Sequence, residues 1–236
     1  ELLSVLRKIE ARGAVDIAHR AKQTVGLIYR YAIASGRAES DPSRDLTGAL
    51  QSHVKKHHAA ITDPAEVGNL MLSIDSFQGT PVVKSALQLS ALLFQRPGEI
   101  RHMEWAEINW NDVQWEIPAI KMKMKQPHIV PLSIQSVAVL QYMQSLKSIS
   151  KFVFPSARGA SRSLSENGVR TALRTMGYTN DQMTAHGFRA MARTMLDEQL
   201  NYRPDFIEHQ LAHAVRDPNG RAYNRTKYLS QRKEMM

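Results

Sequence analysis

The sequence predicts a mainly α-helical protein with a small antiparallel β-sheet, the α+β class. Apolar residues recur at three- and four-residue steps along most of the 236-residue chain, which is the period of amphipathic helices. Strand-like alternation is confined to one stretch, residues 108–132. Hydrophobic residues make up 43% of the chain, which is enough to bury a core and excludes a disordered basic tail.

The first predicted elements form a small helical segment. Residues 15–35 are predicted as one helix, with Gly36 placed to end it. A turn at residues 41–43 precedes a short helix toward Leu50. The next ten residues are polar and rich in His and Lys, so we interpret them as a linker. We therefore expect two domains, residues 1–60 with the linker included and residues 61–236.

The larger segment carries the denser apolar pattern. Asp63 and Pro64 open a helix that runs toward Ile74, with proline in the first turn, where it is tolerated. Residues 81–94 are nearly all apolar, which is typical of a central core helix. A short helix restarts over residues 99–105 before the strands. Further helices are predicted at residues 133–146, 165–176, 186–200 and 204–212, and in a last stretch containing Tyr223 and Tyr228.

The composition indicates the kind of partner and excludes several kinds of site. Lys and Arg number 31 against 22 Asp and Glu, and the formal net charge of +9 indicates either a polyanionic partner such as nucleic acid or a solvated basic surface. The absence of cysteine excludes disulfides, thiolate metal sites and a cysteine nucleophile. No stretch approaches the ~18 consecutive apolar residues of a membrane span. The chain begins at Glu1 rather than Met, so we expect a piece of a longer protein.

Arg96 lies between the apolar helix and Pro97, a place where packing rarely requires an arginine because burying an unpaired guanidinium is costly. Glu99 follows three residues later, a spacing at which a carboxylate can orient the arginine. The same two residues are also consistent with a structural ion pair that closes the helix.

Lys121, Lys123 and Lys125 alternate with methionines. On a strand, the lysines would share one face and both methionines would point into the core. The lysine row is expected either to contact phosphate, with one lysine as a proton donor, or to form a solvated edge that prevents strand aggregation.

His186 and Arg189 are spaced to share one face of a helix, and His213 and Tyr223 follow in order. Taken singly, each is consistent with an ordinary capping, surface or core residue. Together with the arginine and the lysine row above, they can neutralise a phosphodiester without a metal ion, while a tyrosine hydroxyl forms a covalent phosphoenzyme. The ordered set predicts DNA strand cleavage with no metal and no cofactor.

These motifs resemble those of the tyrosine recombinases, or phage integrases, and most closely the branch of prophage and genomic-island integrases. The resemblance covers essentially the whole chain, and the motifs occur in the family's order at compatible spacings. They are Arg96-Pro97-Gly98-Glu99-Ile100-Arg101 with Trp105, the lysine hairpin of residues 121–131, His186-Gly187-Phe188-Arg189, Leu211-Ala212-His213 and Ala222-Tyr223-Asn224-Arg225.

The resemblance implies the tyrosine-recombinase catalytic fold over residues 61–236, preceded by part of a helical core-binding domain over residues 1–60. It also implies that Tyr223 attacks the scissile phosphate and forms a 3′-phosphotyrosyl link, which leaves a free 5′-hydroxyl. Arg96 and Arg189 would hold the non-bridging oxygens of that phosphate.

The remaining roles follow from the same resemblance. Lys123 would protonate the leaving 5′-oxygen, although Lys121 and Lys125 share its predicted face and stay open as alternatives. His186 would assist proton transfer at the tyrosine, and His213 would hydrogen-bond the phosphate. Glu99 would support the first arginine and the first histidine. Tyr228 is the reserve nucleophile, although the role we expect for it is packing against a helix.

The resemblance further implies an active recombinase that integrates or excises a prophage or genomic island. It would act on double-stranded DNA attachment sites in the bacterial cytoplasm, at the nucleoid, with no membrane association. It would be a monomer when free and a tetramer on DNA, with a host DNA-bending protein and a directionality factor as partners. Phosphate contacts would dominate its affinity. The candidate DNA contacts are basic residues of both segments: Lys22, Arg30, Arg37, Arg44, Lys121, Lys125, Arg158 and Arg162.

Three other interpretations remain at this point. A topoisomerase that also forms 3′-phosphotyrosine is disfavoured by the small size of the chain and by the Arg96 motif. A non-catalytic DNA-binding module would use the basic rows only to hold phosphate. A metal-dependent nuclease needs clustered carboxylates, and the histidine-rich run at residues 53–58 has no acidic or Cys partners at ligand spacing.

Overall fold

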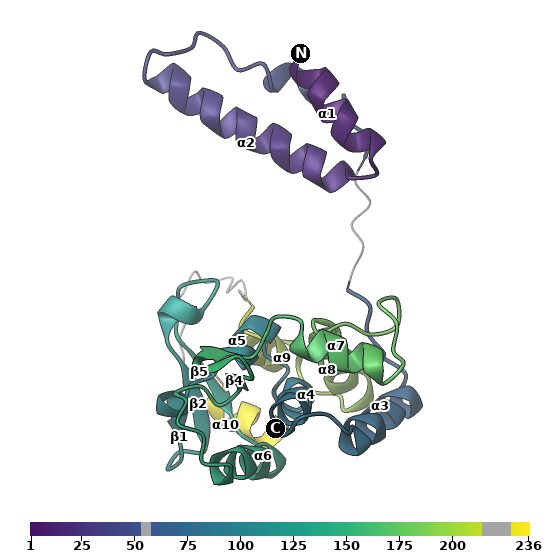
Figure 1. Ribbon diagram of the computed structural model, residues 1–236, viewed down its shortest axis with the longest axis vertical. Coiled ribbons are helices and arrows are strands. Elements are labelled where there is room, and N and C mark those ends of the chain that lie inside the picture. The colour runs from purple at the N-terminus through teal and green to yellow at the C-terminus, as the bar shows by residue number, and fades with distance from the viewer. Residues whose placement is uncertain (53–57, 214–227) are drawn as a thin grey trace. The chain divides into compact units, whose positions relative to one another are not determined.

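The computed structural model contains two compact units, Glu1–His57 and His58–Met236 (Figure 1). It describes residues 1–52, 58–213 and 228–236. Helices predominate and the strands are few, short and antiparallel, so the predicted α+β class is confirmed. None of the helices in the described ranges combines the length and the apolar character that a membrane crossing requires.

The first unit is a helical hairpin. α1 (Leu2–Ala11) packs along α2 (Val15–Ala34), and Leu6 and Ala18 are buried in their interface (Figure 1). Gly36 adopts a φ of +68°, a left-handed conformation that glycine adopts without strain, and α2 therefore ends where the sequence predicts. Only a 3₁₀ turn, Arg44–Leu46, forms in place of the predicted short helix toward residue 50.

The second unit is built around α4 (Pro81–Leu93), which confirms the predicted core helix. Thr80 caps it, because the Thr80 hydroxyl accepts a hydrogen bond from the Val83 amide at 3.4 Å. Leu87 and Leu89 are fully buried within it. The helices that contact α4 include α3 (Pro64–Ser76), α5 (Pro97–Arg101), α6 (Ile134–Ser145), α7 (Gly168–Thr175) and α8 (Gly187–Thr194).

The remaining helices are short, and they differ from the predicted bounds. The predicted helix over residues 99–105 is α5 (Pro97–Arg101), followed by a 3₁₀ turn at Trp105–Glu107. α8 continues into a π-helical turn, Met195–Gln199. The last two helices are α9 (Pro204–Gln210) and α10 (Leu229–Met235). Tyr228 directly precedes α10, while Tyr223 lies outside the described residues.

The predicted strand region forms a three-stranded antiparallel sheet. Its strands, in spatial order, are β1 (Ile108–Asn109), β2 (Gln114–Ile117) and β3 (His128–Pro131). Trp115 pairs with Val130 across the sheet, and both are fully buried. A second hairpin was not predicted from the sequence, because its strands are polar and lack apolar alternation; they are β4 (Pro155–Ser156) and β5 (Gly159–Ser163).

The lysine stretch does not form a strand, so that prediction is wrong. A 3₁₀ turn, Ala119–Lys121, follows Pro118, and Lys125 has a φ of +53°, which no strand residue adopts. The lysines therefore do not share one strand face. Met122 is buried as expected, but the side chain of Met124 is exposed. The stretch is an irregular loop between β2 and β3.

Candidate functional site

Arg96 is fixed by Glu99, as the spacing predicts. Arg96 is the N-cap residue of α5, where its amide donates to Glu99 Oε2 at 2.9 Å and its Nη1 donates to Glu99 Oε1 at 2.8 Å. Glu99 is buried, so this carboxylate is held by the arginine rather than by water. Arg96 Nη2 also donates to the carbonyl of Ala212 at 3.3 Å. The guanidinium is thus oriented by α5 and by the segment that follows α9.

Arg189 reaches the same segment from α8. Its side chain is buried, with Nη1 donating to the Phe94 carbonyl at 3.0 Å and Nη2 donating to the Leu211 carbonyl at 2.7 Å. Burial, and then the charge of Arg96, lower the pKa of Arg189 to about 10. The guanidinium stays protonated at neutral pH. Two neighbouring cations, both held by carbonyl groups of the backbone, favour the binding of an anion.

His213 joins this pair. Arg189 Nη2 lies 2.8 Å from His213 Nε2, and a guanidinium can only donate, so Nε2 accepts and Nδ1 carries the proton. The Nδ1–H group donates to Glu208 Oε2. Arg193 Nε donates to Glu208 Oε1 at 2.9 Å. These contacts define the orientation and the tautomer of His213.

Glu208 was not recognised from the sequence. Burial raises the pKa of this carboxyl, but hydrogen bonds from His213 and Arg193 outweigh burial, and the net pKa lies below its usual value. The signal available was a glutamate five residues before the histidine. That spacing does not place two side chains on one helical face. The side chains of Glu208 and His213 meet because α9 ends at Gln210 and Ala212 turns the backbone with a φ of +51°.

A pocket of about 410 Å³ lies beside Arg96 and Glu99. His186 and Lys123 line it together with them. Desolvation, and then the imidazole of His58, lower the pKa of His186 below its usual value. Arg189 and Arg96 add to this effect, and the charge of Glu99 opposes it. His186 is therefore a neutral imidazole near pH 7.

The three lysines have different environments, although all line this pocket. Lys121 Nζ is bound by the carboxylates of Glu104 and Glu107, and these bonds anchor the loop. Lys125 Nζ lies 3.4 Å from the Ile120 carbonyl. Lys123 is exposed and has no carboxylate partner among the described residues. Lys123 thus offers a free ammonium group beside Arg96, whereas Lys121 serves as an anchor.

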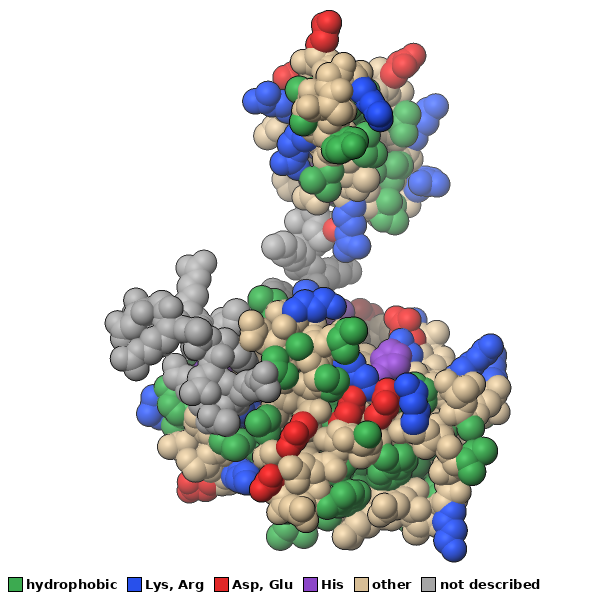
Figure 2. Space-filling model, turned by 90° about the vertical axis from the view of Figure 1, so that its left-hand side faces the viewer, with side chains coloured by type: hydrophobic (Ala, Val, Ile, Leu, Met, Phe, Trp, Pro, Cys, Tyr) green, Lys and Arg blue, Asp and Glu red, His purple; other side chains and the backbone are tan. Residues whose placement is uncertain are grey.

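The other predicted residues lie elsewhere. Arg158 and Arg162 are exposed on the β4–β5 hairpin and do not line the pocket. Tyr223 falls outside the described residues. The ring of Tyr228 packs at 4.8 Å from the ring of Phe206 and 5.5 Å from that of His209, which confirms a packing role for this tyrosine. On the face of the second unit shown in Figure 2, basic and acidic side chains lie beside a histidine.

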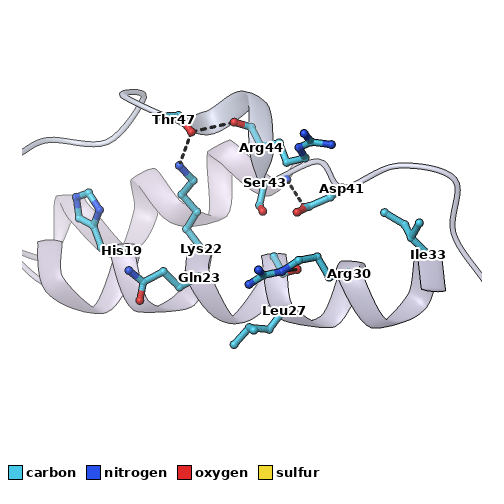
Figure 3. Close-up of a pocket in the computed structure, with 11 residues that line it drawn as sticks. His19, Lys22, Gln23, Leu27, Arg30, Ile33, Asp41, Ser43, Arg44 and Thr47 are labelled. Carbon is cyan, nitrogen blue, oxygen red and sulfur yellow. Dashed lines mark hydrogen bonds between the residues drawn. The ribbon is translucent and has the colours of Figure 1, made fainter. Parts of the chain in front are cut away.

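Lys22, Arg30 and Arg44 line a groove of about 730 Å³ in the first unit (Figure 3). Lys22 projects from α2 toward the segment that carries Arg44, and its Nζ lies 3.4 Å from the Thr47 hydroxyl. Arg30 lies along α2, where its Nε donates to the Gly26 carbonyl at 3.3 Å. Three of the four basic residues predicted to contact DNA in this segment therefore line the groove. The fourth, Arg37, does not line it.

Within the described ranges, no group of three or more His, Asp or Glu side chains is placed to hold a metal ion. The pocket itself is lined by one guanidinium group, one carboxylate, two imidazoles and three lysine side chains, and the guanidinium of Arg189 and the imidazole of His213 meet Arg96 at the Leu211–Ala212 backbone.

Comparisons with known proteins give a consistent result. The sequence matches the Phage integrase family over residues 61–228 and the Phage integrase central domain over residues 1–49. It is 34% identical to the integrase of Enterobacteria phage P4, over 100% of this chain and 56% of the relative. It is 33% identical to the integrase of Shigella phage Sf6, over 100% of this chain and 61% of the relative. The chain thus spans little more than half the length of these relatives.

Solved structures share the fold. A lambda integrase dimer bound to a COC′ core site aligns with a TM-score of 0.68 at 19% identity, over 94% of this chain and 65% of that one. A lambda integrase tetramer bound to a Holliday junction aligns with a TM-score of 0.67 at 19% identity, with the same coverage of 94% and 65%. The Tn1549 transposon integrase in complex with circular intermediate DNA aligns with a TM-score of 0.64 at 10% identity, over 90% of this chain and 76% of that one.

Proposed function

The chain belongs to the phage integrase family, and from this premise we propose that it is a site-specific DNA recombinase acting through Tyr223. It breaks and rejoins DNA strands to integrate or excise a prophage or a genomic island. The observation that carries the proposal is the meeting of Arg96, Arg189 and His213 at the Leu211–Ala212 backbone, beside the pocket that Lys123 and His186 line.

The proposed reaction is a transesterification at a phosphodiester. The Tyr223 oxygen attacks the phosphorus and the bond from phosphorus to the 5′-oxygen breaks, which leaves a 3′-phosphotyrosyl link. The tyrosine proton passes to His186, and Lys123 gives a proton to the departing 5′-oxygen. A 5′-hydroxyl from a second strand then reverses these steps. One phosphodiester replaces another, so the reaction needs no nucleotide hydrolysis.

The electrostatics of the site support these roles. The charge on the non-bridging oxygens grows as the phosphorus becomes five-coordinate, and fixed donors aimed at those oxygens stabilise that state. Arg96 and Arg189 are already oriented by carbonyl and carboxylate groups, so little reorganisation is needed. The lowered pKa of His186 keeps its imidazole neutral, as a proton acceptor requires. Lys123, whose ammonium group has no carboxylate partner in the described part of the chain, is the preferred proton donor.

The first unit supports a role in holding DNA. We assign residues 1–60 to part of a core-binding domain and the linker that follows it, and residues 61–236 to the catalytic domain. The groove formed by Lys22, Arg30 and Arg44 would take a DNA phosphate, with Arg37 as a further contact. In the second unit, exposed basic residues would contact the backbone of the duplex: Lys125, Arg158 and Arg162. Lys121 is assigned to anchoring the loop, because contact with DNA would break its two ion pairs.

The proposed partners are two double-stranded attachment sites and further copies of the chain. Lambda integrase, which shares the fold, has been solved as a dimer on a core site and as a tetramer on a Holliday junction. By analogy, the protein would assemble as a tetramer on DNA and be a monomer when free. A host DNA-bending protein and a directionality factor would regulate it at the nucleoid, in the cytoplasm.

The test uses the full-length protein and nicked duplexes that carry the attachment site of the element encoding it. The nick lets the short cleaved end dissociate, so the covalent complex accumulates and migrates slowly on a denaturing gel. We expect an adduct with the wild type in EDTA, none with Tyr223→Phe, and an adduct with Tyr228→Phe. A wild type without an adduct contradicts recombination, and cleavage abolished by EDTA indicates a metal-dependent nuclease instead.

A further inference from the structure

The chain enters the second unit along the beginning of α8. The imidazole of His58 stacks on the imidazole of His186, with ring centroids 4.6 Å apart and an angle of 18° between the ring planes. His58 belongs to the histidine-rich run that the sequence analysis interprets as a linker. In the structure, this last histidine of the run instead covers one face of the pocket histidine.

The residue after His58 fixes the segment at this place. The carbonyl of Ala59 accepts hydrogen bonds from the Thr184 amide and the Thr184 hydroxyl, each at 3.2 Å. The same carbonyl oxygen lies only 2.4 Å from the position that a Cβ atom would occupy on Gly187. A glycine after His186 is therefore required for the close approach of the two backbones. These contacts hold His58 over His186 independently of the ring stack.

We propose that His58 is a positioning residue that stacks on His186 and holds its imidazole in the orientation needed to accept the proton of the nucleophilic tyrosine. The proposal rests on the proposed function, because it assigns His58 to the same reaction. Offset stacking of two flat rings restricts rotation about the side-chain torsions and excludes water from one face. A histidine without this neighbour would sample several rotamers, and only a fraction of them would be productive.

The stack also affects the charge of the imidazole. The groups that shift the pKa of His186 are His58 from the entering segment, Arg189 from α8, and Arg96 with Glu99 from the segment after α4. Further titratable groups line the same pocket: His102, Lys121, Lys123 and Lys125. The imidazole of His58 and both arginines lower the pKa of His186, while Glu99 raises it. Removal of the His58 ring admits water and removes one of the groups that disfavour protonation. The pKa of His186 then rises, and the neutral base forms only at higher pH.

The experiment compares His58→Ala with His58→Phe, because phenylalanine keeps a flat ring at the same place. Single-turnover cleavage of the nicked duplex is measured over a range of pH at saturating DNA. His58→Ala is expected to lower the cleavage rate about fivefold without weakening DNA binding, and to move the rising limb of the pH profile to higher pH. His58→Phe is expected to keep the rate within about twofold of the wild type.

A second readout is independent of activity. The pKa of His186 is measured by NMR on the same proteins with labelled histidine, and its resonance is assigned with His186→Gln. His58→Ala should raise this pKa relative to the wild type, and His58→Phe should raise it less. An unchanged pKa together with an unchanged rate in His58→Ala would overturn the proposal. If the wild type forms no covalent adduct, the proposed function fails, whereas the NMR titration still decides whether His58 controls His186.

Discussion

Arg189 Nη2 lies 2.8 Å from His213 Nε2, so the imidazole accepts a hydrogen bond from the guanidinium that is proposed to bind the phosphate. An incoming phosphate oxygen competes with Nε2 for that donor. In the proposed complex, Arg189 would turn to the phosphate, and Nε2 of His213 would need to carry a proton to donate to the same phosphate. Glu208, bonded to Nδ1, stabilises the resulting imidazolium. In the proposed function, DNA binding would therefore rearrange this pair.

Glu208→Gln should impair cleavage while leaving DNA binding intact. The amide still accepts a hydrogen bond from Nδ1, but it no longer stabilises a charged imidazole. We expect the activation free energy of cleavage to rise by about 2 kcal/mol, which lowers the rate about 30-fold. Asp197→Asn is the matched control, because Asp197 also pairs with Arg193 but does not contact His213. Single-turnover cleavage and filter binding measure the two quantities. Equal rates for Glu208→Gln and the wild type would exclude this role.

Lys123→Ala should be rescued by a better leaving group. The variant is expected to cleave ordinary DNA at least about 100-fold more slowly, because the 5′-oxygen then leaves without a proton. A substrate with sulfur at the bridging 5′ position needs no proton, so Lys123→Ala should cleave it at nearly the wild-type rate. Lys125→Ala loses only a proposed contact with the DNA backbone, so at saturating DNA it should cleave both substrates at nearly the wild-type rate. If the sulfur substrate restored cleavage by Lys125→Ala but not by Lys123→Ala, Lys125 would be the proton donor instead.

His128 should make folding stability depend on pH. Burial, and then the charge of Arg232, lower the pKa of His128 to about 3. Between its ordinary pKa and this value, the unfolded chain binds a proton that the folded protein does not, so stability falls as pH falls through that window. The slope is about 1.4 kcal/mol per pH unit. Urea unfolding at pH 7 and pH 5 measures it, and His128→Gln should show a smaller loss between these pH values. An equal loss in both proteins would contradict the assignment.

Arg30→Ala should weaken DNA binding in a salt-dependent way. Loss of one phosphate contact reduces the slope of log affinity against log salt by about 1, with little change in sequence preference. Arg20→Ala is the matched control, since Arg20 lies on the same helix but pairs with Asp16 and does not line the groove. Fluorescence anisotropy over a salt series gives both slopes. Identical slopes for the two variants would remove the groove from the DNA interface.

The family and most helices could be predicted from the sequence. The core helix over residues 81–94 and the turn at Gly36 follow from local periodicity and from glycine conformation, which the sequence carries directly. The family match confirms the resemblance drawn from the ordered motifs. Contacts between neighbouring residues of one motif, such as that of Arg96 with Glu99, could also be predicted from the sequence.

Features that depend on tertiary contacts could not be predicted. The lysine stretch alternates like a strand, but the ion pairs of Lys121 with two distant glutamates stabilise a turn instead. Glu208 meets His213 only because the backbone turns after α9. His58 lies in a polar run, and its stack on His186 joins residues more than a hundred positions apart. No local sequence pattern indicates contacts between residues so far apart in the chain.

Peptide mapping of the trapped covalent complex tests the central claim most directly. After nuclease and protease digestion, mass spectrometry identifies the tyrosine that carries the nucleotide and the end of the strand to which it is joined. The account predicts Tyr223 linked to a 3′-phosphate. A nucleotide on Tyr228, or a link to a 5′-phosphate, would contradict it.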